Sequence, residues 1–566
     1  MKRLVSRAAL LLAVTAAAQS SFATNYYFNA NAGGSGNGSA ASPFNSLGAA
    51  GSLDLNPGDH VYLRGTFDAP SGGLTLNAND SGTSAKPVTI SSWGSTRATI
   101  DAVDSFGIRT LDAGGISVSN LNVVGSGPSS TDSTGLYTNT DSGIRFFNDS
   151  GKQNYVRVNN VSVSGFGENG IFVQGGSNES GFNDVKISNS SVFNNQRAGL
   201  SIAADFDTAN RNAVTNVVID HVKAYNNPGR ANRPNEVNSG NGIVIGQVNG
   251  ATIQNSVAYG NGSADASTNG GSVGIWAWDS NKITIQHNES YKNGTAGEHD
   301  GGGFDLDGGV TNSVMKNNYS HDNAGAGYLL AEFSNARNFA GNEVANNVSV
   351  DDGRKNGYGG LHAFGAIDSA SVHDNTVYIS PADKGQANTR DEAPAAIKVR
   401  GPQDKNIDFS NNLLIVKTDG RTEVYQPTKF ENSDNASGIS MDGNTYKLLS
   451  GDSSDPQAAA LKSALDQLGS QLASGQVVAI DAQALSDYLK TTSDSVAVSD
   501  NTDTATNNDD VKKVINPPTE DISTLNPAVS TPTSVSLSPS RAAIPEPSSL
   551  GLIMVGASAL LRRRRR

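Results

Sequence analysis

The stretch that decides the fold reads His299-Asp300-Gly301-Gly302-Gly303-Phe304-Asp305-Leu306-Asp307-Gly308. Its last part alternates apolar and acidic residues, and successive side chains of a strand point to opposite faces. Phe304 and Leu306 therefore face one way, while Asp305 and Asp307 face the other. The stretch predicts a short strand with a buried apolar face and an acidic face, which is either solvated or in contact with a ligand.

Seven other segments have the same form, because each follows Gly or Ala and has apolar residues at its first and third positions. They are residues 171–173, 200–202, 243–245, 275–278, 328–331, 361–364 and 397–400. A landmark of the form apolar-x-(Asn/His/Asp) recurs at intervals of 28 to 34 residues, at Asn160, Asn189, His221, Asn255, His287, Asn317, Asn346 and Asp374. A repeat of this length predicts a solenoid in which one repeat forms one coil.

The repeat also predicts stacks of like side chains, since equivalent positions of neighbouring coils lie about 4.8 Å apart. Four residues after the landmark stand Phe193, Tyr225, Tyr259 and Tyr291. Two residues further on stand Asn195, Asn227, Asn261, Asn293 and Asn323. We therefore expect an aromatic ladder and an asparagine ladder whose amides hydrogen-bond from coil to coil.

With these repeats and ladders, the chain resembles the right-handed parallel β-helix proteins, the superfamily of pectate lyases, polygalacturonases and alginate-modifying enzymes. The resemblance covers about residues 26–446. It implies an all-β fold, a right-handed parallel β-helix solenoid. It also implies a secreted polysaccharide-degrading enzyme, either a lyase or a glycoside hydrolase, and we expect a monomer.

Composition narrows the possible partners and cofactors. The 566 residues include 62 Gly and no Cys, and the formal net charge is −13. A protein this acidic is a poor partner for nucleic acid. The absence of cysteine from the sequence excludes disulfides and thiolate metal sites.

Both ends of the chain carry targeting signals. Lys2, Arg3 and Arg7 precede an apolar run from Ala8 to Ala18, which predicts a secretory signal peptide over residues 1–23. At the other end, Pro545-Glu546-Pro547 is followed by an apolar segment, residues 550–561, and five arginines, residues 562–566. This order resembles the PEP-CTERM sorting tag of exopolysaccharide-producing Gram-negative bacteria. The resemblance implies export, recognition by the envelope sorting machinery, removal of the tag, and an extracellular or envelope-associated protein.

Four segments are expected after the signal peptide: a β-helix with an N-terminal cap over residues 24–446, a helical cap over 447–490, a disordered linker over 491–543 and the tag over 544–566. Asp455-Pro456 begins a helix in which Leu461, Leu465, Leu468 and Leu472 share one face. A second short helix is expected near Asp481. We expect these helices to cover the open end of the solenoid, where strand edges are unpaired.

The second residues of the repeated strands are expected to point outward, and acids, a histidine and cations gather among them from the fifth of these coils to the eighth. The outward pairs are Trp276 and Trp278, Asp305 and Asp307, His362 and Phe364, and Lys398 and Arg400. Aromatic faces stack on sugar rings, while acids and cations bind hydroxyl or uronate groups. This stripe predicts a polysaccharide-binding groove with Trp276, Trp278, Phe364, Lys398 and Arg400 as substrate contacts; packing of the tryptophans under a loop is the alternative.

Three chemical interpretations remain open. Asp305 and Asp307 have the spacing of an inverting hydrolase's acid and base. The order of these acids with Glu332, His362 and the basic pair is similar to that of polygalacturonases, although that family's Asn-Thr-Asp and Asp-Asp motifs are missing and Glu332 should face inward by strand parity.

A calcium-dependent lyase is the second interpretation, with Asp300, Asp305, Asp307 and Asp322 as possible Ca²⁺ ligands and His362 or His321 as base. His321 is otherwise the last member of the aromatic ladder. In the third interpretation the groove binds glycans without cutting them, as an adhesin or an exopolysaccharide-matrix protein.

Overall fold

The structure is a computed structural model. It describes residues 23–204, 212–231, 238–268, 270–333, 335–381, 392–401, 406–417, 422–428, 438–449 and 456–475; of residues 426–428, 456, 457 and 460 it describes the backbone alone. The expected signal peptide, apart from residue 23, the second short helix, the linker and the sorting tag lie outside these residues. Among the described residues no helix is long and apolar enough to cross a membrane.

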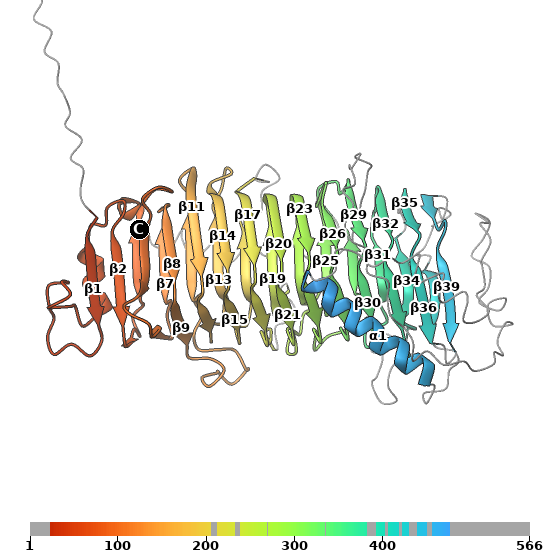
Figure 1. Ribbon diagram of the computed structural model, residues 1–566, viewed down its shortest axis with the longest axis horizontal. Coiled ribbons are helices and arrows are strands. Elements are labelled where there is room, and N and C mark those ends of the chain that lie inside the picture. Colours follow the sequence, from red (N-terminus) through yellow and green to blue (C-terminus); the bar gives the residue numbers. More distant parts are fainter. Residues whose placement is uncertain are drawn as a thin grey trace, which may run out of the picture.

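Three parallel sheets run the length of the molecule, and each coil contributes a strand to them in turn (Figure 1). The 14-stranded sheet consists of β1 (Asn25–Asn29), β2 (His60–Arg64), β5 (Val88–Ser92), β8 (Ile116–Ser119), β11 (Lys152–Asn159), β14 (Gly181–Ser188), β17 (Val214–Asp220), β20 (Val248–Gln254), β23 (Asn281–Gln286), β26 (Val314–Lys316), β29 (Asn342–Ala345), β32 (Ala370–His373), β35 (Ile407–Ser410) and β38 (Ile439–Ser440).

The 13-stranded sheet consists of β3 (Thr66–Asp68), β6 (Ala98–Val103), β9 (Leu121–Gly125), β12 (Ser162–Ser164), β15 (Ser191–Phe193), β18 (Lys223–Tyr225), β21 (Val257–Tyr259), β24 (Glu289–Tyr291), β27 (Tyr319–His321), β30 (Val348–Val350), β33 (Thr376–Ile379), β36 (Leu413–Lys417) and β39 (Thr445–Leu449). The 12-stranded sheet consists of β4 (Leu74–Asn77), β7 (Ile108–Leu111), β10 (Ile144–Asn148), β13 (Asn169–Gly175), β16 (Ala198–Ala203), β19 (Asn241–Gly246), β22 (Val273–Trp278), β25 (Gly302–Asp307), β28 (Tyr328–Ala331), β31 (Gly359–Phe364), β34 (Ala395–Arg400) and β37 (Glu423–Thr428).

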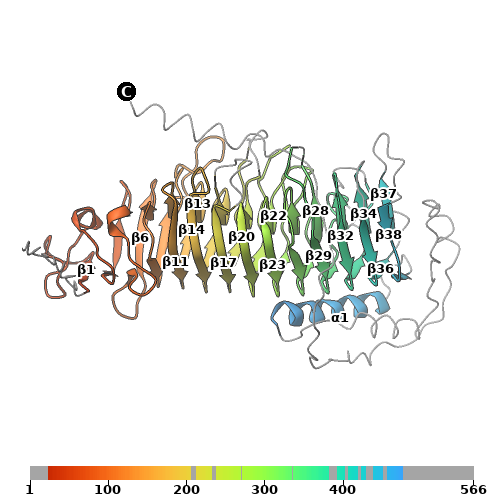
Figure 2. The ribbon, with the colours of Figure 1, turned by 90° about the horizontal axis from the view of Figure 1, so that it is seen from above.

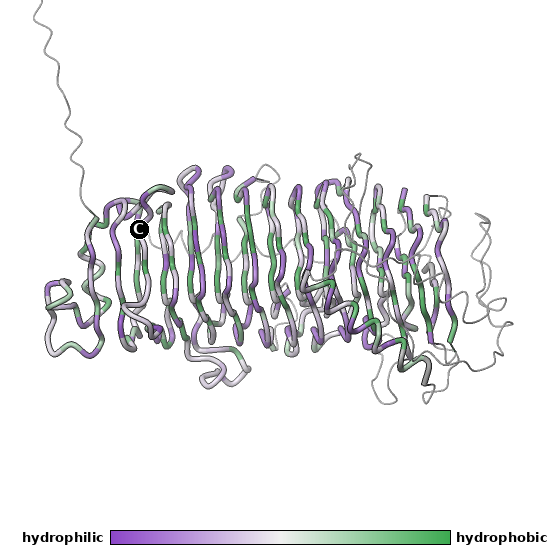
Figure 3. The backbone as a smooth tube through the Cα atoms, viewed as in Figure 1, coloured by the Kyte–Doolittle hydropathy of each residue, from purple (hydrophilic) through white to green (hydrophobic). Residues whose placement is uncertain are grey.

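The inward residues of all three sheets form one continuous core along the solenoid. Apolar and polar positions alternate along the strands in Figure 3. Of two successive side chains in a strand, one therefore points into the core and the other points outward. Two 3₁₀ helices, η1 (Leu47–Ser52) and η2 (Ala78–Asp80), lie near the N-terminal end. There Leu47 and Leu55 join the core, and Phe28 packs on Phe44 with ring centroids 5.1 Å apart. The expected parallel solenoid is confirmed.

The landmark residues form a left-handed corner of the backbone. All eight have a φ between 50° and 56°. A side chain at such a φ is strained, and Asn and Asp tolerate it better than other residues with a Cβ. The period of the sequence is therefore the period of this corner.

Both predicted ladders are present. Successive rings from Phe193 to Tyr291 stack with centroids 4.9–5.0 Å apart. The amide of each ladder asparagine from Asn195 to Asn293 donates to the next, over 2.8–3.2 Å. A second buried ladder, which was not predicted, runs through Asn288, Asn318, Asn347, Asn375, Asn412 and Asn444.

The helix α1 (Pro456–Ala473) does not cover the end of the solenoid, so this expectation is wrong. It lies along the flank of the 13-stranded sheet (Figure 2). Its leucines, residues 461, 465, 468 and 472, pack on Tyr319, Val348, Tyr378 and Ile415. The Tyr319 hydroxyl donates to Asp466 over 2.6 Å, and His287 Nδ1 donates to the Leu472 carbonyl over 2.9 Å. The flank offers an apolar surface as long as the helix, which the narrow end does not.

Candidate functional site

The predicted outward stripe lies on one face of the 12-stranded sheet. One row pairs Trp276, Asp305, Leu329, His362 and Lys398 across β22, β25, β28, β31 and β34. A second row pairs Trp278, Asp307, Ala331, Phe364 and Arg400. The inward neighbours, such as Phe304 and Leu306, belong to the core. Strand parity therefore sorts these side chains as expected.

The stripe is covered, however, and does not form the expected open groove. Trp276 and Trp278 pack with Val244, Val273 and Phe333 in a separate apolar cluster outside the core. The Trp276 indole N–H donates to Asn241 Oδ1 over 3.0 Å, and a Cβ on Gly246 would meet the Trp278 ring. The packing alternative is therefore correct for both tryptophans, and neither offers a free ring face to a sugar. Asp305 is 3% exposed, so it is no surface acid either.

Two acids of this region, Asp307 and Glu332, lie on neighbouring coils. Asp307 ends β25 and is 9% exposed, and Glu332, which follows β28, is half-buried. Glu332 was expected to face inward, but the strand ends at Ala331 and the side chain leaves the alternation there. The Glu332 amide still donates to the Phe364 carbonyl over 3.1 Å.

Both acids bind protons more tightly than usual. Burial raises the pKa of Asp307 well above its ordinary range; the Gly308 amide, which donates to Oδ1 over 2.7 Å, opposes this shift, and the charges of Asp300 and Glu332 add to it. Burial, together with the charge of Asp368, raises the pKa of Glu332 to about 7. At least one of the two carboxyls therefore keeps a proton near neutral pH.

A buried ion pair holds the loop that follows Glu332. Arg337 binds both oxygens of Asp279, which is 1% exposed and directly follows Trp278. A Cβ on Gly309 would meet Asp279 Oδ1 at 2.9 Å, so this position needs glycine. Phe333 packs on the tryptophans at the start of the same loop. Sequence reasoning missed Asp279, Phe333 and Arg337, because their contacts join separate coils through a loop that has no repeat.

His362 and the basic pair lie deeper than a substrate-contacting group should. His362 is 1% exposed; its Nδ1 accepts from the Gly359 amide over 3.3 Å and its ring packs on Tyr358. Lys398, also 1% exposed, donates to the Gly357 carbonyl and to Glu392 over 2.5 and 2.7 Å. Arg400 binds the same Glu392 carboxylate. Burial lowers the pKa of Lys398. The expectation of an exposed base and of two free cations in a groove is wrong.

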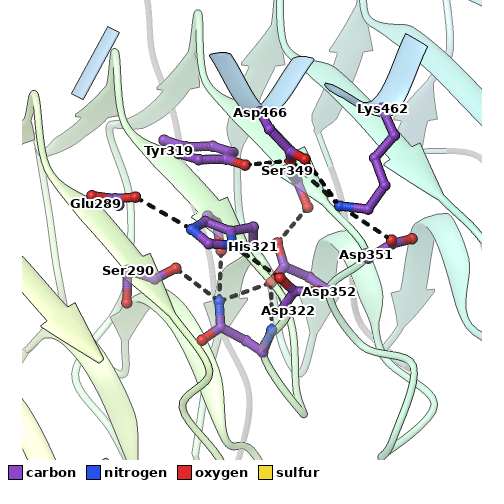
Figure 4. Close-up of polar contacts among 12 residues, drawn as sticks. Glu289, Ser290, Tyr319, His321, Asp322, Ser349, Asp351, Asp352, Lys462 and Asp466 are labelled. Carbon is purple, nitrogen blue, oxygen red and sulfur yellow. Dashed lines mark hydrogen bonds and ion pairs between the residues drawn. The ribbon is translucent and has the colours of Figure 1, made fainter. Parts of the chain in front are cut away.

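His321 lies on another sheet and continues the aromatic ladder. It ends β27 in the 13-stranded sheet, and its ring stacks on Tyr291 at 4.7 Å and on Tyr319 at 4.4 Å. Its nitrogens donate to Glu289 over 3.3 Å and to Asp322 over 3.1 Å (Figure 4). Burial alone would lower the pKa of His321, but these two carboxylates raise it to about 9. A protonated histidine held in this way is no base for chemistry at Asp307.

The predicted calcium ligands do not come together. Asp322 follows β27, where it binds His321 and Arg354, and so belongs to the cluster under α1. Asp305 and Asp307 belong to the 12-stranded sheet, and the Asp300 carboxylate accepts from the Tyr358 hydroxyl. Among the described residues no three His, Asp or Glu side chains are grouped to hold a metal ion. These four acids therefore do not fit a common Ca²⁺ site.

Comparison with known proteins supports the fold and the tail. Residues 142–377 match the family model of the right handed beta helix region, and residues 543–566 match that of the PEP-CTERM protein-sorting motif. No curated protein sequence matches the chain.

Solved structures with a similar fold include the GH136 lacto-N-biosidase from Eubacterium ramulus, at 16% identity and a TM-score of 0.50, covering 75% of this chain and 68% of that one. The pectate lyase Pel9A has 16% identity and a TM-score of 0.37, over 69% and 78% of the two chains. The A-module of the Azotobacter vinelandii mannuronan C-5 epimerase AlgE6 has 16% identity and a TM-score of 0.39, over 70% and 93%. The chain is thus a right-handed parallel β-helix protein that ends in a PEP-CTERM sorting motif, which indicates export and sorting at the cell envelope.

Proposed function

We propose that this protein is an exported polysaccharide-degrading enzyme that hydrolyses a glycosidic bond at Asp307 and Glu332. One observation carries the proposal: two acids, at and just beyond the C-terminal ends of adjacent strands of the 12-stranded sheet, both have raised pKa values and are buried to different extents. Glycoside hydrolysis uses a pair of carboxyl groups, one as the acid and one as the base or nucleophile, whose environments set their roles.

The environments suggest which acid has which role. Asp307 is the more deeply buried, and burial favours its protonated form, so it is assigned as the general acid that protonates the leaving oxygen. Glu332 is closer to solvent and ionises at about pH 7, so its carboxylate is assigned to activate water or to attack the sugar. We expect kcat/KM to rise with pH through about 7, as Glu332 ionises.

Elimination is less well supported. A lyase needs a base near the sugar's α-proton and a positive group on the uronate carboxylate. His362 is buried against Tyr358, while Lys398 and Arg400 both bind Glu392. These contacts favour hydrolysis over elimination.

The test is a panel of polysaccharides treated with the full-length chain. We expect new reducing ends without the ultraviolet absorbance of unsaturated uronates. Asp307→Asn and Glu332→Gln should each lose activity by about 100-fold or more, as is usual when an acid–base catalyst is removed. Asp305→Asn, on the same strand, is the matched control and should retain most activity.

Full activity in both the Asp307 and Glu332 variants would rule out this site. Unsaturated products would instead support a lyase. Glycan binding without any cleavage would support the non-catalytic alternative, an adhesin or exopolysaccharide-matrix protein.

A further inference from the structure

A cluster of aromatic side chains lies on the outer face of the first three strands of the 14-stranded sheet. We name it the aromatic platform and define it as Tyr27 of β1, Tyr62 and Arg64 of β2, and Trp93, which directly follows β5. Tyr27 and Tyr62 are register partners on adjacent strands, and Tyr62 alternates with the core residue Leu63. Both tyrosines therefore point away from the core.

The side chains of the aromatic platform contact one another. The ring centroids of Tyr27 and Tyr62 lie 5.3 Å apart with planes 24° from parallel, and those of Tyr27 and Trp93 lie 4.9 Å apart at 58°. The Arg64 guanidinium carbon lies 3.7 Å from the centroid of the Trp93 ring, and Arg64 Nε donates to the Trp93 carbonyl over 3.4 Å. These contacts hold the four side chains together as one surface.

Solvent reaches the whole aromatic platform. Arg64 is exposed and the three rings are half-buried, whereas the tryptophans of the covered stripe are almost fully buried. Among the described residues, the hydroxyls of Tyr27 and Tyr62 and the indole N–H of Trp93 form no hydrogen bond. Aromatic rings that gather in one exposed cluster are typical of a binding site. The platform thus offers ring surface together with polar groups at the ring edges.

Arg64 makes the aromatic platform cationic. Among the described residues no carboxylate lies within 4 Å of its guanidinium, and the Trp93 carbonyl is the acceptor of its one hydrogen bond. Arg157 and Arg337, in contrast, bind aspartates. Stacking on an aromatic ring leaves the N–H groups of a guanidinium able to donate to a carboxylate. In a chain with a net charge of −13, such a cation complements an anionic ligand.

We infer that the aromatic platform binds an acidic polysaccharide, with sugar rings against Tyr27, Tyr62 and Trp93 and a sugar carboxylate on Arg64. Aromatic rings pack against the apolar faces of pyranose rings, while the phenol and indole groups hydrogen-bond sugar hydroxyls. The guanidinium supplies a charge-assisted contact that selects an acidic sugar over a neutral one.

The aromatic platform is separate from the proposed catalytic acids. It lies on the 14-stranded sheet, whereas Asp307 and Glu332 belong to the region of the 12-stranded sheet. β2 is the second strand of the 14-stranded sheet, and β23, in the coil of Asp307, is the ninth. The two sites are therefore seven coils apart, or about 34 Å at about 4.8 Å per coil. The inference goes beyond the proposed hydrolysis and does not depend on it.

Titration calorimetry with the full-length chain tests the inference. Alginate oligosaccharides, which carry a carboxylate on every ring, are the acidic probe, and dextran oligosaccharides are the neutral one. We expect wild type to prefer alginate, with an affinity that falls as salt increases. Arg64→Gln should lose about 5-fold or more of the alginate affinity, because a charge-assisted contact is removed. Equal binding of alginate and dextran by wild type would overturn the inference.

Arg157→Gln is the matched control for the charge. Arg157 stands on the same sheet and also lies over an aromatic ring, 4.0 Å from the Tyr155 centroid, but it binds Asp184. The alginate affinity of this variant should stay within about twofold of wild type. Equal losses in Arg64→Gln and Arg157→Gln, or no loss in either, would contradict the assigned role of Arg64.

Acrylamide quenching of tryptophan fluorescence locates the bound sugar. Trp276 and Trp278 are buried, so the emission that acrylamide reaches should come from Trp93. Saturating alginate should reduce this quenching, because the ligand covers the Trp93 ring. Unchanged quenching at saturation would mean that alginate binds elsewhere, and the inference would then be wrong.

Poly-glutamate separates a sugar from any other polyanion. Tyr62→Leu should weaken alginate binding severalfold, because an aromatic ring is lost, and should leave the weaker binding of poly-glutamate unchanged. Tyr259→Leu, which replaces a half-buried tyrosine of the aromatic ladder, is the matched control and should bind alginate like wild type. Poly-glutamate binding as tight as that of alginate would refute the assignment of a sugar.

The two proposals fail in different ways. Alginate binding that depends on Arg64, in a chain that cleaves no polysaccharide, would refute the proposed hydrolase and leave this inference standing. Cleavage of a polysaccharide that depends on Asp307 and Glu332, with no binding of alginate at the aromatic platform, would refute this inference alone.

Discussion

The two halves of the outer face of the 12-stranded sheet have the same strand register but different surroundings. Arg145 and Phe172 remain half-buried, whereas Trp276 and Lys398, further along the same row, are almost fully buried. Covering residues such as Phe333 and Glu392 come from the connections between strands, not from the strands themselves. The alternation of a strand decides on which side of the sheet a residue lies, and the connections decide whether solvent reaches it.

Removing a ring from each half should give the largest contrast. Trp276→Ala should lower the free energy of unfolding by about 3–5 kcal/mol, because a buried ring and its hydrogen bond to Asn241 are lost. Phe172→Ala should cost about 1 kcal/mol, because its ring is only half-buried. Urea denaturation followed by circular dichroism measures both values. Similar losses would show that the two halves are equally packed.

Replacing a cation in each half should give a smaller difference in the free energy of unfolding. Lys398→Met should cost about 2 kcal/mol, since the Gly357 carbonyl and the Glu392 carboxylate lose their buried donor. Arg109→Met should change stability by no more than about 0.5 kcal/mol, because solvent reaches its site. The same denaturation experiment applies. A stability cost at Arg109 as large as that at Lys398 would contradict the partial exposure of Arg109 to solvent.

The pH dependence of stability should distinguish Glu332 from an acid with ordinary partners. The pKa of Glu332 is raised from 4.5 to about 7 in the folded chain. Its contribution to stability is therefore complete below pH 4.5 and is lost as the pH rises through about 7. Glu332→Gln has no carboxyl group to ionise, so the variant does not lose this contribution. The Tm of the variant, relative to that of wild type, should therefore increase as the pH rises from 4.5 to about 7.

Glu343→Gln is the control with the opposite sign. The hydrogen bond from His373 lowers the pKa of Glu343, so this acid stabilises the chain above its unfolded pKa of 4.5 and the contribution is lost as the pH falls. The Tm of Glu343→Gln should therefore lie below that of wild type at neutral pH and approach it in acid. Parallel Tm curves for the two variants would contradict both assignments.

Fluorescence quenching should report how deeply the tryptophans are buried while the protein stays folded. Trp276 and Trp278 are buried, whereas Trp93 is half-buried beside the exposed Arg64. We expect iodide to quench part of the wild-type emission and almost none of the emission of Trp93→Phe. Strong quenching in that variant would mean that the loops over the tryptophans open readily.

Local sequence predicted most of the fold and little of the site. The landmark asparagines are themselves the left-handed corners, so their spacing gave the coils directly. The outward and inward residues followed from strand parity. Parity failed at Glu332, because the strand stops one residue earlier. Trp278 contacts Gly246, and Arg337 contacts Asp279. Both contacts join residues far apart in sequence, so no local sequence pattern predicts them. The prediction of His321 as a base was wrong, because a histidine can either continue an aromatic ladder or act as a base, and the sequence alone does not separate the two. In the structure His321 stacks on Tyr291 in the ladder.

The path of α1 determines where the described chain leaves the solenoid. The helix starts beside Leu449 in the last coil and runs back until the Leu472 carbonyl meets His287, five coils earlier. The chain therefore leaves the described helix at the waist of the solenoid and not at its tip. The 12-stranded sheet belongs to a different side of the cylinder from the sheet on which α1 packs, so the helix does not cover the face that carries Asp307 and Glu332.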